Sequence, residues 1–176
     1  MPFYVYGRDK PGAGAGLMKL TEAHWSYMDQ FADRLLLRGP TLSDDGAEHT
    51  GSVHVVDLDD RDSAERFATE EPFWMAGLYR QVTATRLVVL QHREIVRGAP
   101  HALVTGEWAP RPREDGRELD DRVRFAGLLV DDDQARTTGI VAVVRAVPCE
   151  AASAVQPLAG TGVALTAQRW ELGGRR

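Results

Sequence analysis

The chain has 176 residues, 43% of them hydrophobic, which is enough to build the core of one ordinary domain or of two small ones. Lysine and arginine number 21 against 26 aspartates and glutamates, so the net charge is -5. This balance, without any cluster of basic side chains, excludes a nucleic acid as an expected partner.

The cysteine content and the N-terminus both indicate a cytoplasmic protein. Cys149 is the single cysteine, so no intramolecular disulfide can form and a reducing compartment is expected. The N-terminal MPFYVYGRDKPG has no signal-peptide pattern, and no apolar run approaches the length of about 20 residues that a membrane span needs. We therefore expect no targeting signal and no membrane contact. Basic charge that is nearly all arginine is typical of a GC-rich bacterial genome.

The first half of the chain predicts the element order of a ferredoxin-like unit. Periodicity and turn residues predict, in order, a strand (3–8), a helix (18–33), a strand (34–39), a hairpin, a strand (52–58), a helix (63–71) and a strand (81–90). The glycine-rich GRDKPGAGAGL before the first helix is predicted to be a flexible loop. The order βαββαβ describes an antiparallel sheet with both helices on one face.

A histidine occupies a core position of the first predicted helix. The residues Leu20, His24, Tyr27, Phe31 and Leu35 follow helical spacing, so the imidazole shares a face with side chains that should be buried. This histidine is therefore either a structural core residue or a working one.

The second predicted helix also turns a titratable group inward. Asp62 is expected to cap its N-terminus, with Glu65 three residues later, and Pro72 marks its end. Glu71 then closes the inward stripe. Burial favours the neutral forms of an imidazole and a carboxyl, whereas their mutual approach favours the ion pair, and this balance tunes proton-transfer groups near neutral pH. The sequence thus indicates a His24–Glu71 pair for acid/base chemistry, although each residue alone has an ordinary structural explanation.

The chain contains two copies of one unit. The stretch RGPTLSDDGAEHTGSVHVV (38–56) aligns without a gap on AGLLVDDDQARTTGIVAVV (126–144), so that Thr-Gly falls on Thr-Gly and the valine-rich segments coincide. Upstream, FYVYGR matches LVTGEW, with Gly7 on Gly106. Duplication of one unit is the economical interpretation.

The second copy predicts three strands, a helix (149–159) and a final strand (163–172), but the shorter interval between its first two strands leaves its first helix shortened or lost. We predict domains at 1–92 and 101–176, joined by a linker at 93–100. Two such units, packed face to face, cover the sheet face that each alone leaves bare. The predicted fold is α+β, with two tandem ferredoxin-like (βαββαβ) units that form an intrachain pseudo-dimeric α+β barrel.

Other side chains of the first half are candidates for binding a substrate. Tyr4, Tyr6 and Arg8 share one face of the first strand, and an arginine on a strand face needs a partner that an anionic ligand could supply. Aromatic residues follow the second helix, and such a lining suits a flat, partly apolar molecule with an ionisable group. The candidate substrate-binding residues are Tyr6, Arg8, Tyr27, Arg38, Phe73 and Trp74.

Three other features are interpreted as structural. The glycines of residues 7–16 do not match G-x-G-x-x-G, so we expect no dinucleotide and no other cofactor. Asp44, Asp45, His49 and His54 lie close together in the sequence, but a hairpin with solvated polar residues explains them better than a metal site, and no metal is expected. The terminal GGRR is predicted to be a frayed tail.

The motifs of the first half together resemble the YCII-related (YciI-like) domain family over residues 2 to about 90. The resemblance is carried by FYVYGRDKP, EAHW, LLLRGP, a T-G-S motif and an acid-Pro-aromatic motif followed by A-G-L-Y. It implies a ferredoxin-like, dimeric α+β barrel fold and an active site of one histidine and one aspartate. By motif, the family histidine is His24, and the family aspartate falls on Glu71. Members with assigned reactions include a cofactor-independent dehydrochlorinase of aromatic catabolism.

Two features depart from the family pattern. Glutamate at position 71 adds a methylene to the aspartate side chain, which moves the carboxylate by about a bond length. The second half has no histidine that matches His24, and Ala159 and Gly160 fall where Glu71 and Pro72 stand. One site per chain is therefore expected, with the second half as scaffold or as a wall.

These observations predict a cofactor-independent acid/base enzyme of lyase, isomerase or cyclase type, in which His24 moves a proton and Glu71 orients or charges it. The expected substrate is a small aromatic or polyketide-like molecule of secondary metabolism. The sequence leaves open whether such pseudo-dimers associate into a homo-oligomer. A non-catalytic accessory protein that binds a small molecule or a partner is the main alternative, because duplication with loss in one copy suits a scaffold equally. A cofactor-free oxygenase is the third, by analogy of fold alone.

Overall fold

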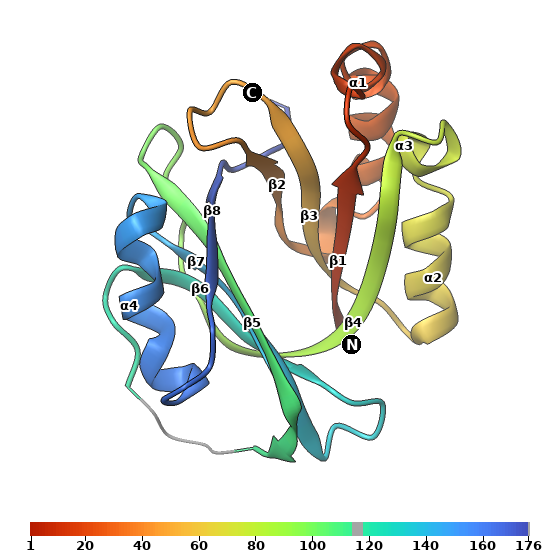
Figure 1. Cartoon of the computed structure of the whole chain (residues 1–176). Helices are drawn as coiled ribbons and strands as arrows, with labels where there is room; N and C mark the ends of the chain where they lie inside the picture. The colour runs from red at the N-terminus through yellow and green to blue at the C-terminus, as the bar shows by residue number, and fades with distance from the viewer. Residues whose placement is uncertain (114–117, 176) are drawn as a thin grey trace. The chain divides into compact units, whose positions relative to one another are not determined.

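The computed structural model describes residues 1–113 and 118–175, which form an α+β fold of antiparallel strands and α-helices (Figure 1). The chain divides into two compact units. Unit 1 is Met1–Ala84 with Leu172–Arg176, and unit 2 is Thr85–Glu171. This division lies within a strand, before the predicted linker at 93–100.

Unit 1 contains β1 (Pro2–Asp9), α1 (Gly14–Asp29), a 3-10 turn (Ala32–Arg34), β2 (Leu35–Leu42), β3 (His49–Asp57), α2 (Arg61–Thr69), α3 (Pro72–Met75) and the start of β4 (Tyr79–His92). Unit 2 contains the rest of β4, β5 (His101–Pro112), β6 (Val123–Val130), β7 (Arg136–Val144), α4 (Pro148–Ala159) and β8 (Thr166–Trp170). The predicted order of strands and helices is confirmed, and α3 is an addition to it.

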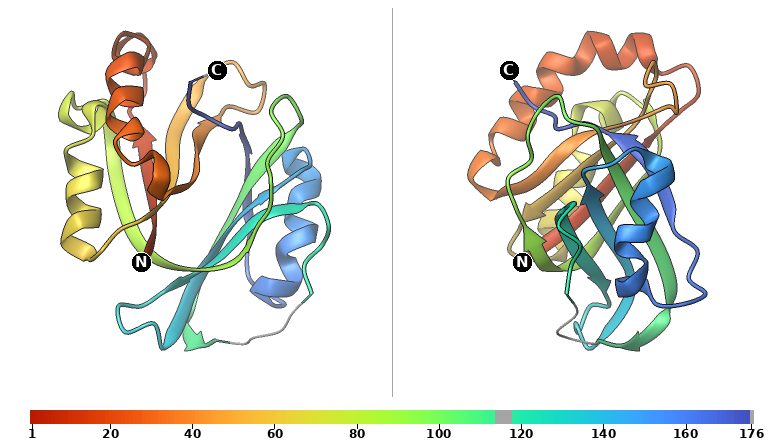
Figure 2. Two further views of the ribbon diagram at one scale, coloured as in Figure 1. Left: turned by 180° about the vertical axis from the view of Figure 1, so that it is seen from behind. Right: turned by 90° about the vertical axis from the view of Figure 1, so that its left-hand side faces the viewer.

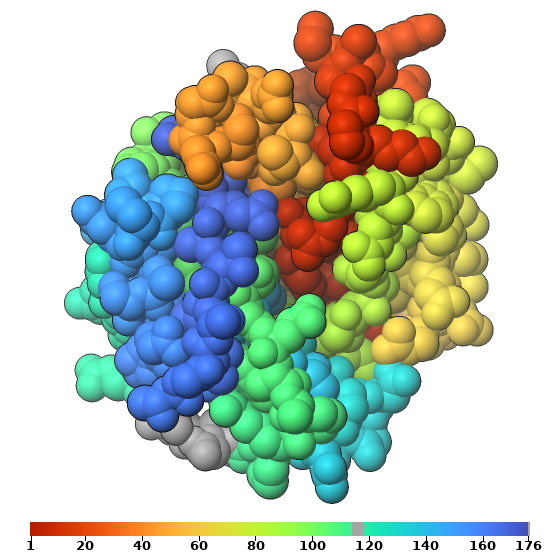
Figure 3. All heavy atoms as spheres, viewed as in Figure 1, coloured from red at the N-terminus to blue at the C-terminus, as the bar shows by residue number. Residues whose placement is uncertain are grey.

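In unit 1, β3 pairs with β1 on one side and with β2 on the other, in antiparallel register. Side chains alternate between the faces of this sheet. Phe3, Val5 and Val56 share one face and pack with Met28 of α1 and Phe67 of α2 in one apolar cluster. The three helices of unit 1 lie on this face (Figure 2), and α1 and the β2–β3 loop reach the surface (Figure 3, red and orange).

Helix α1 begins earlier and ends earlier than the sequence predicted. It includes Gly14 and Gly16 of the segment that was predicted to be a flexible loop, so that prediction is wrong for this part. A Cβ at Gly16 would lie 2.6 Å from a side-chain carbon of Leu78, so glycine allows close packing here. The helix has 16 residues, and nowhere in residues 1–113 and 118–175 is a helix long and apolar enough to cross a membrane.

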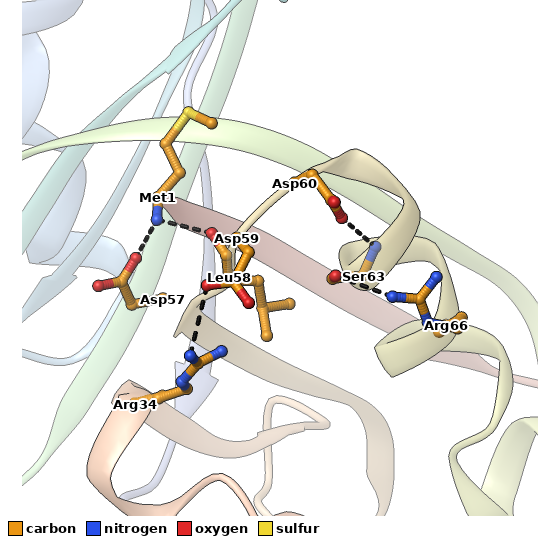
Figure 4. A network of polar contacts seen from close by, with 8 residues as sticks. All are labelled: Met1, Arg34, Asp57, Leu58, Asp59, Asp60, Ser63 and Arg66. Carbon is orange, nitrogen blue, oxygen red and sulfur yellow. Dashed lines mark hydrogen bonds and ion pairs between the residues drawn. The ribbon is translucent and has the colours of Figure 1, made fainter.

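Helix α2 is capped by Asp60, not by the predicted Asp62. The Asp60 carboxylate accepts a hydrogen bond from the backbone N–H of Ser63 at 2.7 Å (Figure 4). The helix ends at Thr69, so Glu71 does not belong to it as the sequence predicted. Pro72 instead opens α3, because a proline fits the first turn of a helix, where its missing N–H is not needed.

In unit 2 the strands are ordered β8-β5-β7-β6, and the second part of β4 pairs with β6. Helix α4 packs on β5, β7 and β8 with Ala151, Ala154, Val155 and Ala159 in the core. Between β5 and β6, the described residues 113 and 118–122 form no helix, in agreement with the predicted shortening or loss of the first helix of this copy.

The C-terminal segment 172–175 is bound to unit 1, so the prediction of a frayed tail is wrong for these residues. The N–H of Gly173 donates to the carbonyl oxygen of Arg38 at 2.9 Å. The Arg175 guanidinium contacts Glu22 at 2.6 Å and Asp29 at 2.8 Å, both on α1. These contacts tie the end of the chain to the helix that carries His24.

Candidate functional site

His24 and Glu71 form a hydrogen-bonded pair inside unit 1. Nδ1 of His24, in α1, donates to Oε1 of Glu71 at 2.5 Å. The two side chains are only 10% and 4% exposed. The structure therefore brings together the two residues that the sequence nominated for acid/base chemistry.

Glu71 is held in place by the start of α3. Its backbone is extended, its side chain caps the helix, and Oε2 accepts the N–H of Trp74 at 3.0 Å. One carboxylate oxygen thus serves the helix and the other serves His24. This double use fixes the carboxylate that the imidazole meets.

Aromatic rings surround the His24 imidazole. Phe73 is stacked on it, with ring centroids 4.4 Å apart and planes at 2°. Tyr79 meets the ring of Phe73 edge-on at 5.9 Å, and the ring of His54 lies 5.6 Å from that of His24. The site is therefore an aromatic environment with a single carboxylate against the imidazole.

Burial shifts the ionisation of the groups around the pair. It holds the pKa of His54 well below 6.5, and the positive charge of Arg38, like that of His24 whenever His24 is protonated, acts in the same direction. Burial, with the negative charges of Glu70 and Glu71, raises the pKa of Tyr27 to about 12. Burial and then the charge of Glu71 raise the pKa of Tyr79 well above 10. At neutral pH, His54 is neutral and both phenols keep their protons.

A second histidine–carboxylate pair, which the sequence analysis missed, joins β3 to β1. Nδ1 of His49 donates to Oδ2 of Asp9 at 2.6 Å, Nε2 lies 3.5 Å from Oγ of Ser52, and the ring meets Phe73 edge-on at 6.4 Å. The interpretation of His49 and His54 as solvated hairpin residues is wrong, because His49 is bonded to Asp9 and His54 is buried in β3.

This second pair could have been predicted only from the register in which β1 and β3 pair. Arg8 pairs with Gly51 across β1 and β3, so the next residue along β1 approaches the start of β3. A sequence gives the strands but not their register when several residues separate them. Histidine and aspartate can also bind metals. Within the described part of the chain, however, no three or more histidine, cysteine, aspartate and glutamate side chains lie close enough together to hold a metal ion.

The structure does not bring Tyr6 and Arg8 to His24. Tyr6 pairs with Val53 in register, one residue from the pair of Val5 with His54, so its side chain lies on the opposite sheet face from His54. Its hydroxyl contacts Oγ1 of Thr41 at 3.2 Å, and the Arg8 guanidinium lies 4.3 Å above its ring.

The other four predicted binding residues lie on the helical side of unit 1. Phe73 contacts the imidazole directly, and Trp74 supplies the backbone N–H to Glu71. The Tyr27 hydroxyl donates to the carbonyl oxygen of Phe67 at 3.1 Å. Arg38 is paired across the sheet with His54, but its guanidinium donates to Asp29 at 3.1 Å. Phe73 is therefore the predicted binding residue in closest association with the pair.

Three solved structures are similar to the chain. A candidate monooxygenase from Lactobacillus acidophilus is 8% identical over 98% of this chain and 97% of that chain, with a TM-score of 0.52. One from Fusobacterium nucleatum is 10% identical over 99% of this chain and 95% of that chain, with a TM-score of 0.53. At these identities the two likenesses concern the fold alone.

The third structure is 5-chloro-2-hydroxyhydroquinone dehydrochlorinase from Burkholderia phenoliruptrix, in a complex with 2,5-dihydroxybenzoquinone. It is 27% identical over 52% of this chain and 95% of that chain, with a TM-score of 0.46. No curated protein matches the sequence. The family model of the YCII-related domain matches residues 1–88, half of the chain, and this half includes His24 and Glu71. The chain therefore belongs to the YCII-related domain family.

Proposed function

We propose that the protein is a cofactor-independent acid/base enzyme in which His24 transfers a proton and Glu71 orients the imidazole. The observation that carries this proposal is the 2.5 Å hydrogen bond between Nδ1 and Oε1, made where both side chains are almost fully buried. The bond makes Nδ1 the protonated nitrogen and leaves a lone pair on Nε2. Nε2 is then the atom that takes a proton from a substrate.

Glu71 supports this role in two ways. A carboxylate that accepts from Nδ1 holds the ring in one tautomer and stabilises the imidazolium that forms when Nε2 takes up a proton. The N–H of Trp74 fixes the carboxylate itself. His54, whose ring lies 5.6 Å from that of His24, is neutral because burial lowers its pKa, so it adds no positive charge to oppose the imidazolium.

The surroundings favour a flat, partly apolar substrate. Phe73 presents a ring parallel to the imidazole, and the half-buried Trp74 and Tyr27 flank this part of unit 1. Tyr6 and Arg8 are not included, since their side chains lie on the other sheet face. A small aromatic or polyketide-like molecule with an acidic C–H is the substrate class of this proposal. Elimination, isomerisation and cyclisation all begin with the removal of such a proton.

We also infer that the chain is a tandem of two ferredoxin-like units with a single site, in unit 1. The order β1-β3-β2 in unit 1 corresponds to β5-β7-β6 in unit 2. A close glycine contact recurs as well. A Cβ at Gly51 would lie 2.6 Å from the carbonyl oxygen of Gly7, and one at Gly139 would lie 2.6 Å from that of Gly106.

A reaction that needs only a base tests the proposal. In the probe 5-nitrobenzisoxazole, removal of the ring C–H proton forms the nitrile as the N–O bond breaks, and the product is the coloured 2-cyano-4-nitrophenolate. The proton passes to His24 and then to water, so no other reactant is needed. We expect His24→Ala and Glu71→Gln to lower the rate of this elimination about a hundredfold, the contribution typical of a positioned base.

His92→Gln, which changes a histidine of β4 outside the site, is the matched control and should keep the wild-type rate. Circular dichroism of each variant establishes that the fold is intact. Folded His24→Ala and Glu71→Gln proteins with wild-type rates would falsify the acid/base proposal and would leave a binding role for the site.

A further inference from the structure

We propose that His49, held by Asp9, is a second proton-transfer group of the same site, so that the site performs two proton transfers on one substrate. This inference rests on the proposed function and deepens it: His24 removes a proton from carbon, and His49 delivers one to the substrate oxygen. The corresponding reaction class is the keto–enol isomerisation of an aromatic carbonyl compound.

The two histidines have the same arrangement. Each donates Nδ1–H to a buried carboxylate, at 2.5 Å for His24 and 2.6 Å for His49. In His24 this leaves Nε2 for a substrate. In His49, Nε2 makes only a long contact of 3.5 Å with the Ser52 hydroxyl, which a substrate oxygen can replace, and each carboxylate stabilises an imidazolium. Both rings also contact Phe73, His24 by stacking and His49 by its edge. The two pairs therefore meet at one aromatic side chain.

Two buried polar atoms beside the Asp9–His49 pair have no hydrogen-bond partner in the described structure. They are Oδ1 of Asp9, whose side chain is only 6% exposed, and the hydroxyl of Tyr79, which is also buried. A buried donor without an acceptor is unfavourable, and native proteins normally provide one. A substrate oxygen supplies that acceptor to Tyr79, whose high pKa keeps its proton in place.

The difference in exposure between the two imidazoles suits a division of labour. The His49 side chain is 27% exposed and that of His24 is 10% exposed. His49 can therefore exchange its proton with water between turnovers. The groups that face it are Asp9 of β1, Ser52 of β3 and the ring of Phe73 in α3.

The proposed step balances without a cofactor. Nε2 of His24 takes a proton from the carbon next to the carbonyl group, and the C–H electrons form the carbon–carbon double bond. The carbonyl π electrons move to oxygen, which receives a proton from Nε2 of protonated His49 while the Tyr79 hydroxyl donates a hydrogen bond to it. His24 ends protonated and His49 neutral, and proton exchange with water restores both.

Two probe reactions separate His49 from His24. Elimination of 5-nitrobenzisoxazole needs only a base, whereas tautomerisation of phenylpyruvate needs a base at carbon and an acid at oxygen, and the ultraviolet absorbance of the enol reports its rate. We expect His49→Gln to lower the tautomerisation rate about a hundredfold and to change the elimination rate less than about threefold. His24→Ala should lower both rates, and His92→Gln should lower neither.

Asp9→Asn is the second variant, which keeps the shape of the side chain but removes the charge that stabilises the His49 imidazolium. It should reproduce the selective loss of tautomerisation. Equal rates of tautomerisation in wild-type, His49→Gln and Asp9→Asn proteins, with His24→Ala inactive, overturn the second proton transfer and leave the first. A wild-type protein that catalyses the elimination but not the tautomerisation also overturns it. Wild-type rates in His24→Ala instead contradict the proposed function itself.

Discussion

Unit 1 buries polar side chains where unit 2 buries aliphatic ones. When the two copies of the repeat are aligned, Ser52 and His54 of β3 fall on Ile140 and Ala142 of β7, and all four residues are buried. The backbone of this strand therefore folds without polar groups at these positions. Since burying polar groups is unfavourable unless they are bonded, their presence in unit 1 needs a reason beyond stability.

The cross-strand contact between the first and third strands of each unit differs in the same way. In unit 1 it is the hydrogen bond between Nδ1 of His49 and Oδ2 of Asp9. Trp108 and Thr137 hold the aligned positions in unit 2, and the indole Nε1–H donates to the Thr137 carbonyl oxygen at 3.0 Å. Both units therefore have a contact at this position, and only unit 1 makes it with titratable groups. The comparison thus separates what the fold needs from what the site adds.

The largest expected effect on stability comes from replacing Glu71 with alanine, the residue that unit 2 has at the aligned position, Ala159. Glu71→Ala leaves the buried His24 without its partner and removes the cap of α3. We expect a loss of about 3 kcal/mol in the free energy of unfolding, as is typical when one member of a buried pair is removed. Urea denaturation measures it.

Glu70→Ala is the matched control, because Glu70 is exposed and adjacent in sequence, and its loss should stay below about 0.5 kcal/mol. Combining His24→Leu with Glu71→Ala should recover part of the loss, since the pair then becomes apolar as a whole. A Glu71→Ala protein as stable as the wild type contradicts the claim that the pair is buried and coupled.

A smaller effect concerns His54, whose aligned residue in unit 2 is Ala142. Burial lowers the pKa of His54 in the folded chain, so below about pH 6.5 the unfolded chain binds more protons than the folded one. The free energy of unfolding therefore falls as the pH drops from 6.5, by up to about 1.4 kcal/mol per pH unit, until the pKa of the folded state is reached.

His54→Gln should remove this part of the slope between pH 6.5 and 5. His101 of unit 2 also has a lowered pKa, from burial, and remains in both proteins, so its contribution cancels in the comparison of slopes. Denaturant titrations at several pH values measure both slopes. Identical slopes in wild type and His54→Gln show that His54 is not the neutral, buried group described above.

The sequence was sufficient to predict the strands, the helices other than α3 and the approach of His24 to Glu71, because helical periodicity shows which residues turn inward even when the bounds are inexact. It was wrong about how Glu71 arrives there. The inward stripe was extended through residue 71, whereas α2 ends at Thr69 and Pro72 starts a separate turn. A proline after a helix is compatible with both outcomes, and only the backbone distinguishes them.

The Asp9–His49 pair and the placement of Arg8 could not be predicted for a different reason. Alternation along a strand correctly put Tyr6 and Arg8 on one face, but it does not tell which face the helices cover. Strand register, which brings Asp9 to His49, depends on pairing between distant segments. Local patterns therefore predict the elements and the inward residues, while the pairings that complete the site are tertiary facts.

The smallest expected effect comes from Tyr79, whose buried hydroxyl has no hydrogen-bond partner among the described residues. Tyr79→Phe removes a buried hydroxyl that forms no well-aligned hydrogen bond, although the nearby Ser52 hydroxyl acts to lower its pKa, so the free energy of unfolding should stay the same or rise by up to about 1 kcal/mol. Tyr6→Phe is the matched control. Its hydroxyl contacts Thr41 at 3.2 Å, so its removal should lower stability by about 1 kcal/mol.

The opposite signs expected for the two tyrosines distinguish a hydroxyl kept for function from one kept for the fold. If Tyr79→Phe is as stable as the wild type but tautomerises phenylpyruvate more slowly, the hydroxyl serves a substrate oxygen and not the core. A loss of stability as large as that of Tyr6→Phe means that Tyr79 has a structural partner in solution. Its place beside the Asp9–His49 pair would then belong to the scaffold, as the contact of Trp108 with Thr137 does in unit 2.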